Sequence, residues 1–133
     1  MITADAVAFG IALATPQEID TLNILRASLL AMRRAVEALL LPADFLFIDG
    51  NQPVSCDVPQ ETLVGGDGRC VSIAAASILA KVSRDRMMME YDLLYPGYGL
   101  SGHKGYPTRE HLEAIRRLGP SPIHRRTFRG VVA

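Results

Sequence analysis

One run of helix-forming residues, VSIAAASILAKVSRDRMMMEYDLL at positions 71–94, constrains the fold more than any other part of the chain. Its Ala, Leu, Met and Arg content and its length favour a single long helix. The GGDG sequence at 65–68 precedes it, and Pro96 and Gly97 follow it, so both ends are marked by turn-forming residues. A helix this long gains most of its stability by packing against other elements.

The other predicted elements are shorter. Three apolar segments are predicted strands: residues 6–14, 45–48 and 61–64. Thr15-Pro16-Gln17-Glu18 has the pattern of a helix start, and the helix it begins is expected to stop before Pro42. Thr108 is expected to cap a short helix that ends near Gly119, after a glycine-rich loop at 96–107. The order β-α-β-β-α-loop-α predicts an α/β or α+β layered domain.

Length and composition are those of one soluble domain, since the chain has 133 residues and 49% of them are hydrophobic. Cys56 and Cys70 are too few for a disulfide framework, so reduced thiols and a cytoplasmic location are expected. The N-terminus has no basic region before its apolar run, and no apolar run reaches the ~20 residues of a membrane span. Neither a membrane nor an obligate protein partner is expected.

Charge is divided unevenly along a chain whose formal net charge is zero. Residues 101–133 carry seven basic and two acidic side chains, a net +5, which leaves −5 on residues 1–100. Such asymmetry is a cue for a polyanionic partner, although a solvated basic tail would have the same composition.

Asp49 ends the apolar run FLFIDGN at 45–51. In α/β sheets, ligands gather at the carboxyl ends of strands, so Asp49 is a candidate ligand there. The alternative is a turn, because Asp-Gly and Gly-Asn are common turn formers.

Ser77, Lys81 and Asp85 are spaced by four residues and therefore lie along one face of the predicted long helix, with Arg84 beside them. This carboxylate is a second candidate ligand that could point across a cleft toward Asp49. An ordinary Lys-Asp pair on a solvated helix surface is the alternative, and it would contribute only a few tenths of a kcal/mol.

The glycine-rich stretch YGLSGHKGYPT at 98–108 has the composition of a phosphate-binding loop. Glycines free backbone amides to face an anion, Lys104 supplies a point charge, and Tyr106 supplies a flat ring and a hydroxyl. A flexible surface loop is the alternative. Metal binding by His103 and His111 lacks a matched third ligand. Carboxylates for a hard cation beside a loop for a polyanion form the pattern of a two-metal nuclease.

Several blocks together resemble bacterial ribonuclease HII over almost the whole chain. They are FIDGN at 47–51, GDGRCVSIAAASILAKVSRD at 66–85, YPGYGLSGHKGYPTREH at 95–111 and GPSPIHRRTF at 119–128, with EIDTLNILRASLLAMRRAV at 18–36. The resemblance implies a ribonuclease H-like fold, a mixed five-stranded sheet flanked by helices. It also implies an endoribonuclease that hydrolyses the RNA strand of RNA–DNA hybrids and nicks duplex DNA 5′ of an embedded ribonucleotide.

In such enzymes four carboxylates hold Mn²⁺ or Mg²⁺, and two of those positions match Asp49 and Asp85. The tyrosine that senses the ribose 2′-hydroxyl matches Tyr106, a sensible role because that hydroxyl distinguishes RNA from DNA. The resemblance and the loop composition also place five residues in substrate binding: Ser77, Lys81, Arg84, His103 and Lys104.

The family's Asp-Glu-x-Gly-Arg-Gly strand motif, which supplies the other two carboxylates, does not occur in this sequence. Residues 1–133 are therefore expected to be a partial ribonuclease HII domain that lacks the first two strands of the sheet. Three hypotheses follow: a truncated enzyme that is inactive or weak alone, a non-catalytic module that binds hybrid duplexes, or one part of a split enzyme.

Overall fold

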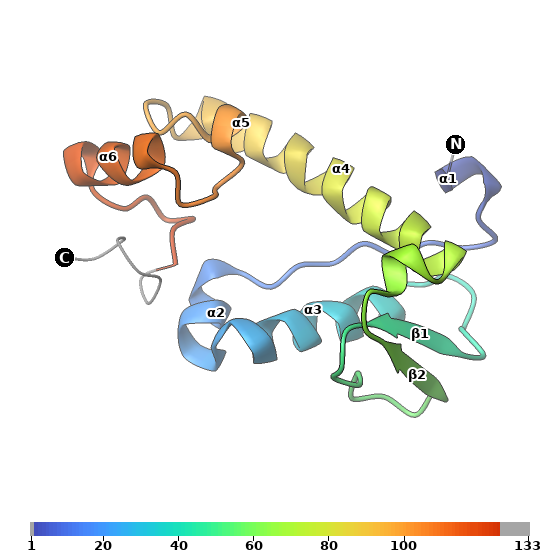
Figure 1. Cartoon of the computed structure of the whole chain (residues 1–133). Coiled ribbons are helices and arrows are strands. Elements are labelled where there is room, and N and C mark those ends of the chain that lie inside the picture. The colour runs from blue at the N-terminus through green and yellow to red at the C-terminus, as the bar shows by residue number, and fades with distance from the viewer. Residues whose placement is uncertain (1, 126–133) are drawn as a thin grey trace. The chain divides into compact units, whose positions relative to one another are not determined.

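The computed structural model describes residues 2–125, and these divide into two compact units. The first comprises residues 2–14 and Leu22–Ala80, and the second comprises Thr15–Thr21 and residues 81–125. Along the chain the elements are α1 (Ile2–Asp5), α2 (Pro16–Leu22), α3 (Ile24–Glu37), β1 (Leu46–Asp49), β2 (Gln60–Leu63), η1 (Gly66–Gly68), α4 (Val71–Leu94), α5 (Leu100–His103) and α6 (Arg109–Leu118) (Figure 1). The predicted mixture of helices and strands is confirmed, and the predicted long helix matches α4 at both ends.

Within the first unit, β1 and β2 form a parallel pair in which Leu46 lies opposite Gln60 and Asp49 opposite Leu63 (Figure 1). Both strands lie within one residue of their predicted positions. Along β1, Leu46 and Ile48 are buried. Met32 and Val36 of α3 pack against them, so this helix covers one face of the strand pair. Buried and exposed residues therefore alternate along β1, and the buried side faces α3.

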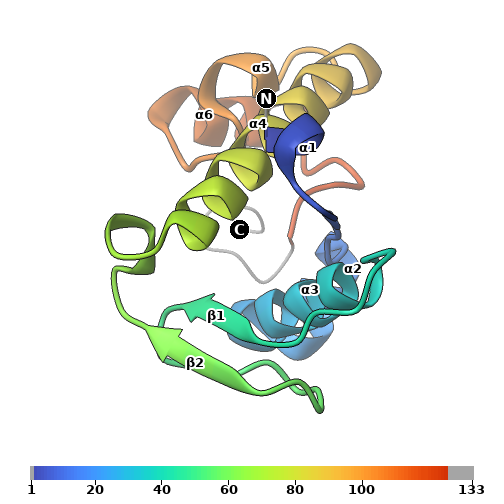
Figure 2. The same cartoon turned by 90° about the vertical axis from the view of Figure 1, so that its right-hand side faces the viewer.

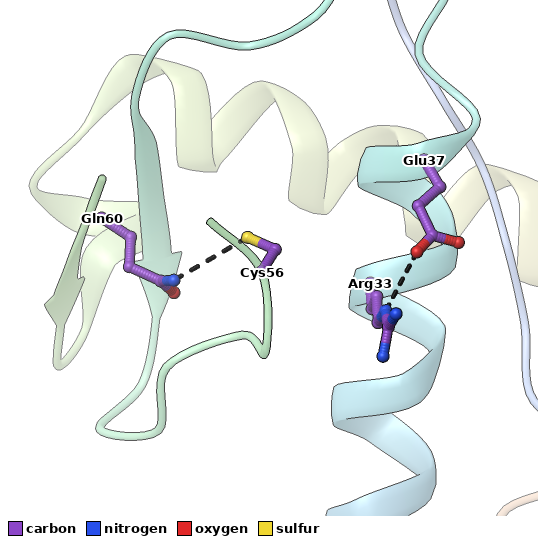
Figure 3. Close-up of polar contacts among 4 residues, drawn as sticks. All are labelled: Arg33, Glu37, Cys56 and Gln60. Carbon is purple, nitrogen blue, oxygen red and sulfur yellow. Dashed lines mark hydrogen bonds and ion pairs between the residues drawn. The ribbon is translucent and has the colours of Figure 1, made fainter. Parts of the chain in front are cut away.

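The segment that connects β1 to β2 is ordered by the side chain of Gln60. Its amide accepts from the backbone nitrogen of Val54 at 2.7 Å and donates to the Val54 oxygen at 2.8 Å. The same nitrogen lies 3.9 Å from the sulfur of Cys56 (Figure 3). On α3, Arg33 and Glu37 form an exposed i,i+4 ion pair of 2.9 Å, shown in the same view.

The predicted strand at 6–14 is wrong. These residues form no strand within the described part of the chain. Gly10 lies so close to α3 that a Cβ there would collide with the Ala35 oxygen and lie 3.3 Å from the Ala38 Cβ. Phe9, Ile11 and Leu13 are exposed. A strand exists only where a neighbouring strand accepts and donates its backbone hydrogen bonds, and this segment has the alternating side chains without that partner.

The helix start at Thr15 is confirmed as a capping box. The Glu18 amide donates to Thr15 Oγ1 at 3.1 Å, and the Thr15 amide donates to Glu18 Oε1 at 3.0 Å. The expectation of one helix up to Pro42 is wrong, because Asn23 has a φ of 86° and separates α2 from α3. Its Oδ1 accepts from the Arg26 amide at 3.0 Å and so caps α3.

In the second unit, α5 lies at the C-terminal end of α4, and α6 is the next helix along the chain (Figure 1, Figure 2). The core there consists of Tyr98, Leu100, Ala114 and Ile115, with Tyr91, Tyr95 and Ile123 packed against it. Thr108 caps α6 as predicted and accepts from the His111 amide at 3.2 Å. The predicted glycine-rich loop contains the short helix α5, so the prediction of a loop throughout 96–107 is wrong in that part.

The two cysteines are free thiols, as expected. None of the helices in residues 2–125 is both long and apolar enough to cross a membrane. The last eight residues of the predicted basic tail, 126–133, lie outside the described residues.

Candidate nucleic-acid interface

Asp49, the last residue of β1, is exposed and its carboxylate is anchored on one side. Its Oδ1 accepts a hydrogen bond of 3.0 Å from the backbone amide of Gly66. Gly66 is buried, and a Cβ there would lie 2.5 Å from Ile73 Cδ1 and 3.4 Å from Asp49 Oδ1. Glycine at position 66 is therefore what allows the turn after β2 to approach the carboxylate. Asp49 is the last residue of β1, and the bond joins it to the turn after β2 rather than to a turn at 49–51; its second oxygen takes no part in this bond.

Ser77, Lys81 and Asp85 all lie on α4, at the helical spacing predicted for them. Ser77 and Lys81 are exposed, and Asp85 is half-buried. Asp49 and Ser77 belong to the first unit, whereas Lys81, Arg84 and Asp85 belong to the second.

The structure brings Arg84 together with the loop that holds Lys104. The Arg84 guanidinium donates from Nη2 to the Lys104 backbone oxygen at 3.2 Å. Lys104 itself is a non-glycine residue in the left-handed region, with a φ of 56°, and it ends α5. The same Arg84 nitrogen would lie 3.2 Å from a Cβ at Gly105, so a glycine there leaves room for the guanidinium. Arg84 therefore shapes the loop, besides any contact with a ligand.

Tyr106 presents its ring to solvent, with 64% of the residue exposed, although its backbone is fixed. Its amide donates to the His103 oxygen at 3.0 Å, and its carbonyl lies 2.9 Å from Nδ1 of the buried His111. An exposed aromatic ring on an anchored backbone loses little further conformational freedom when it stacks on a base or sugar.

Three histidine rings are gathered behind this loop. His103 stacks on His111 with ring centroids 4.1 Å apart, and His111 lies 5.0 Å from His124. The Nε2 atoms of His111 and His124 are 2.8 Å apart. Burial lowers the pKa of His124 to about 4, and His111 and His103 contribute by charge repulsion. The pKa of His111 is also lowered, mainly by burial.

The donor chemistry of the described residues does not complete a metal site. In residues 2–125, no group of three or more His, Cys, Asp or Glu side chains is arranged to hold a metal ion. The histidine nitrogens that a metal would need are used in hydrogen bonds. Asp49 and Asp85 have the oxygen ligands that suit Mn²⁺ or Mg²⁺, but as two carboxylates they fit only part of such a site.

From the sequence alone, His103 was assigned to substrate binding, His111 was weighed only as a metal ligand, and His124 had no assigned role. One signal was available, because His111, Ala114 and Ile115 follow the spacing of the buried face of a helix. A histidine on that face belongs to the core and needs hydrogen-bond partners there.

Comparison with known proteins decides the family. A family model described as Ribonuclease HII matches residues 1–131. The chain belongs to the ribonuclease HII family. Ribonuclease HII of Syntrophotalea carbinolica is 58% identical over 130 residues, and that of Geobacter sulfurreducens is 56% identical over 131. Ribonuclease HII of Moorella thermoacetica is 55% identical over 129 residues.

These alignments cover 98%, 98% and 97% of this chain, but 62%, 60% and 63% of the respective relatives. The chain thus spans about three fifths of the length of these ribonuclease HII relatives. The resemblance predicted from the sequence blocks is confirmed at the level of the family.

Proposed function

We propose that this chain is the part of a ribonuclease HII that grips an RNA–DNA hybrid, or duplex DNA with an embedded ribonucleotide, through the loop at 98–108. The observation that carries the proposal is the combination at Tyr106 of an exposed ring and an anchored backbone. Lys104, two residues earlier, adds a cation for a phosphate. His103 and Arg84 support this loop from within the same unit.

The tyrosine hydroxyl is the group that would meet the ribose 2′-hydroxyl. Hydrogen bonding to that hydroxyl distinguishes ribose from deoxyribose, whereas ring stacking alone does not. Lys104 would add affinity without sequence preference, because its charge meets the phosphate backbone. Ser77 and Lys81, both exposed on α4, are proposed as further substrate contacts.

We further propose that Asp49, in the first unit, and Asp85, in the second, each act as a ligand for Mn²⁺ or Mg²⁺, and that cation binding needs additional carboxylates. Asp49 supports this role because one of its oxygens is already oriented by Gly66. The Asp-Glu-x-Gly-Arg-Gly motif does not occur in the 133 residues. On this proposal residues 1–133 form part of one ribonuclease HII domain, and alone they bind hybrid duplexes but cleave them weakly or not at all.

A split enzyme is the alternative for the same residues, in which another chain supplies the absent carboxylates. The two arrangements share the substrate class and the phosphodiester hydrolysis of ribonuclease HII. They differ in whether activity returns when a peptide carrying the Asp-Glu-x-Gly-Arg-Gly motif is added to the purified chain.

The test measures fluorescence anisotropy of a labelled RNA–DNA hybrid with the purified chain over a range of salt concentrations. The expected result is salt-sensitive binding, weakened several-fold by Lys104→Ala with a salt slope reduced by about 1. Arg33→Gln, in the exposed ion pair of α3, is the matched control and is expected to bind as the parent does. Absence of binding at low salt, or equal effects of the two variants, would overturn the proposal.

Cation binding has its own test, in which free Mn²⁺ is followed by electron paramagnetic resonance. Asp49→Asn and Asp85→Asn are each expected to weaken Mn²⁺ binding, and Asp67→Asn, at an exposed aspartate of η1, is not. Equal affinities in all four proteins would remove Asp49 and Asp85 from the site.

A further inference from the structure

We propose that His111 and His124 are positioning residues that hold the Tyr106 loop in place, and that they do so only while both rings are neutral. The inference deepens the proposed function, since it concerns the loop assigned there to hybrid binding. It is carried by the geometry of the three rings, all of which lie in the second unit.

The hydrogen bonds between Ser121, His124, His111 and Tyr106 fix which nitrogen of each histidine ring carries the proton. The Ser121 amide donates to His124 Nδ1 at 2.9 Å, so that nitrogen carries no proton and the proton of His124 is on Nε2. His124 Nε2 then donates to His111 Nε2 at 2.8 Å. The remaining nitrogen of His111, Nδ1, therefore carries its proton and donates to the Tyr106 oxygen at 2.9 Å.

The hydrogen bonds of His103 fix its tautomer as well. The Gly105 amide donates to His103 Nδ1 at 3.1 Å, so His103 Nε2 carries the proton and donates to the Tyr98 oxygen at 2.7 Å. The loop backbone is thus held at three points by two stacked rings: the Tyr98 oxygen, the Gly105 amide and the Tyr106 oxygen.

A proton added to His111 or His124 has no free nitrogen to occupy without breaking a contact. The acceptor nitrogen of His124 already faces the Ser121 amide, and also the Ser121 hydroxyl at 2.7 Å. The acceptor nitrogen of His111 faces the N–H of His124. A proton on His111 Nε2 would set N–H against the N–H of His124, so the His111 ring that holds Tyr106 must shift. A proton on His124 Nδ1 would face the Ser121 amide, and the Ser121 hydroxyl would have to turn to accept from it, so the segment that holds His124 in place must rearrange.

The charged groups around His111 and His124 act on any proton that these rings gain. Arg84 contacts the loop at the Lys104 oxygen, and Arg125 follows His124 in the chain. The Asp92 carboxylate of α4 accepts from Ser101 Oγ of α5 at 2.6 Å. Asp20 of α2 acts on Arg125, whose pKa is lowered by burial and by Arg84. Burial and the neighbouring rings lower the pKa of both His111 and His124, in agreement with this arrangement.

The first test needs no nucleic acid. Ring-nitrogen NMR on the ¹⁵N-histidine-labelled chain reads tautomers and titration directly. At pH 7.5 we expect an Nδ1–H tautomer for His111 and an Nε2–H tautomer for His124. Acidification should titrate His124 only near pH 4, with the amide signals of Ser121 and Tyr106 shifting together. Titration of both rings near pH 6.5 would overturn the proposal. A Tyr106 amide signal that does not shift when His124 titrates would also overturn it.

The second test links the rings to binding through a pH profile. Positive charge gained in acid strengthens ordinary phosphate binding, so a rising affinity is the result that charge alone predicts. We expect the opposite, a several-fold loss of hybrid affinity between pH 7 and pH 3.5, with most of the loss near pH 4, where His124 gains its proton. A smooth rise in affinity toward acid would contradict the positioning role.

A matched pair of variants separates positioning from simple filling of the core. His124→Gln keeps a donor for His111 without a titrating ring, whereas His124→Phe keeps an aromatic ring without a donor. Weaker binding at pH 7.5 in His124→Phe, with recovery in His124→Gln, supports the proposal, and equal binding of the two variants contradicts it. If the parent chain binds no hybrid, the proposed function fails while the NMR result still decides this inference.

Discussion

Asp49 Oδ1 accepts a hydrogen bond of 3.0 Å from the amide of Gly66, which joins the end of β1 to the turn that follows β2. The bond satisfies a buried backbone donor and fixes the direction of the carboxylate. One side chain can therefore serve the turn with one oxygen and a ligand with the other.

Substitutions of Asp49 should separate these two roles. Asp49→Asn keeps an oxygen that can accept from Gly66, so its free energy of unfolding should stay within ~0.5 kcal/mol of the parent. Asp49→Ala leaves the buried amide without this acceptor and should cost about 1–2 kcal/mol. Urea denaturation measures both, and equal stability of the Ala and Asn variants would contradict the role of this bond.

Gly66 should tolerate no side chain. The methyl group of Gly66→Ala would press on Ile73 and approach Asp49, so we expect a loss of about 1–3 kcal/mol in the free energy of unfolding. Gly68→Ala is the matched control, because a Cβ there meets no atom within 4 Å among the described residues. Thermal and urea unfolding of the two variants give the comparison, and equal midpoints would show that the approach at Gly66 is unimportant.

Stability should depend on pH through His124. The unfolded chain takes up a proton near pH ~6.5. In the folded protein His124 takes up this proton only near pH 4, because its pKa is lowered to about 4. The stabilisation is therefore complete above pH 6.5 and is lost as the pH falls toward 4, because the unfolded state then binds more protons. The urea midpoint should fall between pH 7 and pH 5, and His124→Gln should reduce that dependence. A flat profile in the parent would contradict the lowered pKa.

Lys104 should lower the free energy of unfolding while it strengthens hybrid binding. A left-handed φ is unfavourable for a side chain by roughly 1 kcal/mol, so Lys104→Gly should raise the free energy of unfolding by about 0.5–1 kcal/mol. It should also weaken hybrid binding several-fold. Lys104→Ala removes the charge and keeps the strain, so it should weaken binding without the gain in stability. Loss of stability in Lys104→Gly, measured by urea denaturation, would be the contrary result.

Local signals predicted most elements correctly. Thr15 with Glu18, and Thr108 before α6, marked two helix starts because capping depends on residues only three positions apart. The long helix α4 needed only its composition and its flanking glycines and prolines. Lys104 and Tyr106 were likewise chosen from composition, and the structure adds only that their loop is anchored.

The incorrect predictions concern features that depend on contacts between distant parts of the chain or on the conformation of a single residue. The segment 6–14 has the pattern of a strand, but pairing needs a second backbone that no local pattern specifies. The break at Asn23 depends on one residue adopting a φ of 86°, which helix periodicity does not reveal. The contact between His111 and His124 crosses a turn and requires the packed core of the second unit, so spacing alone could not find it.

The proposal that Tyr106 reads a ribose is tested most directly by its hydroxyl. The measurement is the ratio of affinities of the purified chain for a duplex with one embedded ribonucleotide and for the same duplex in DNA alone, compared between the parent and Tyr106→Phe. We expect the parent to prefer the ribonucleotide duplex several-fold, and Tyr106→Phe to lose that preference while it keeps its affinity for DNA. An unchanged ratio in Tyr106→Phe, or no preference in the parent, would contradict the account.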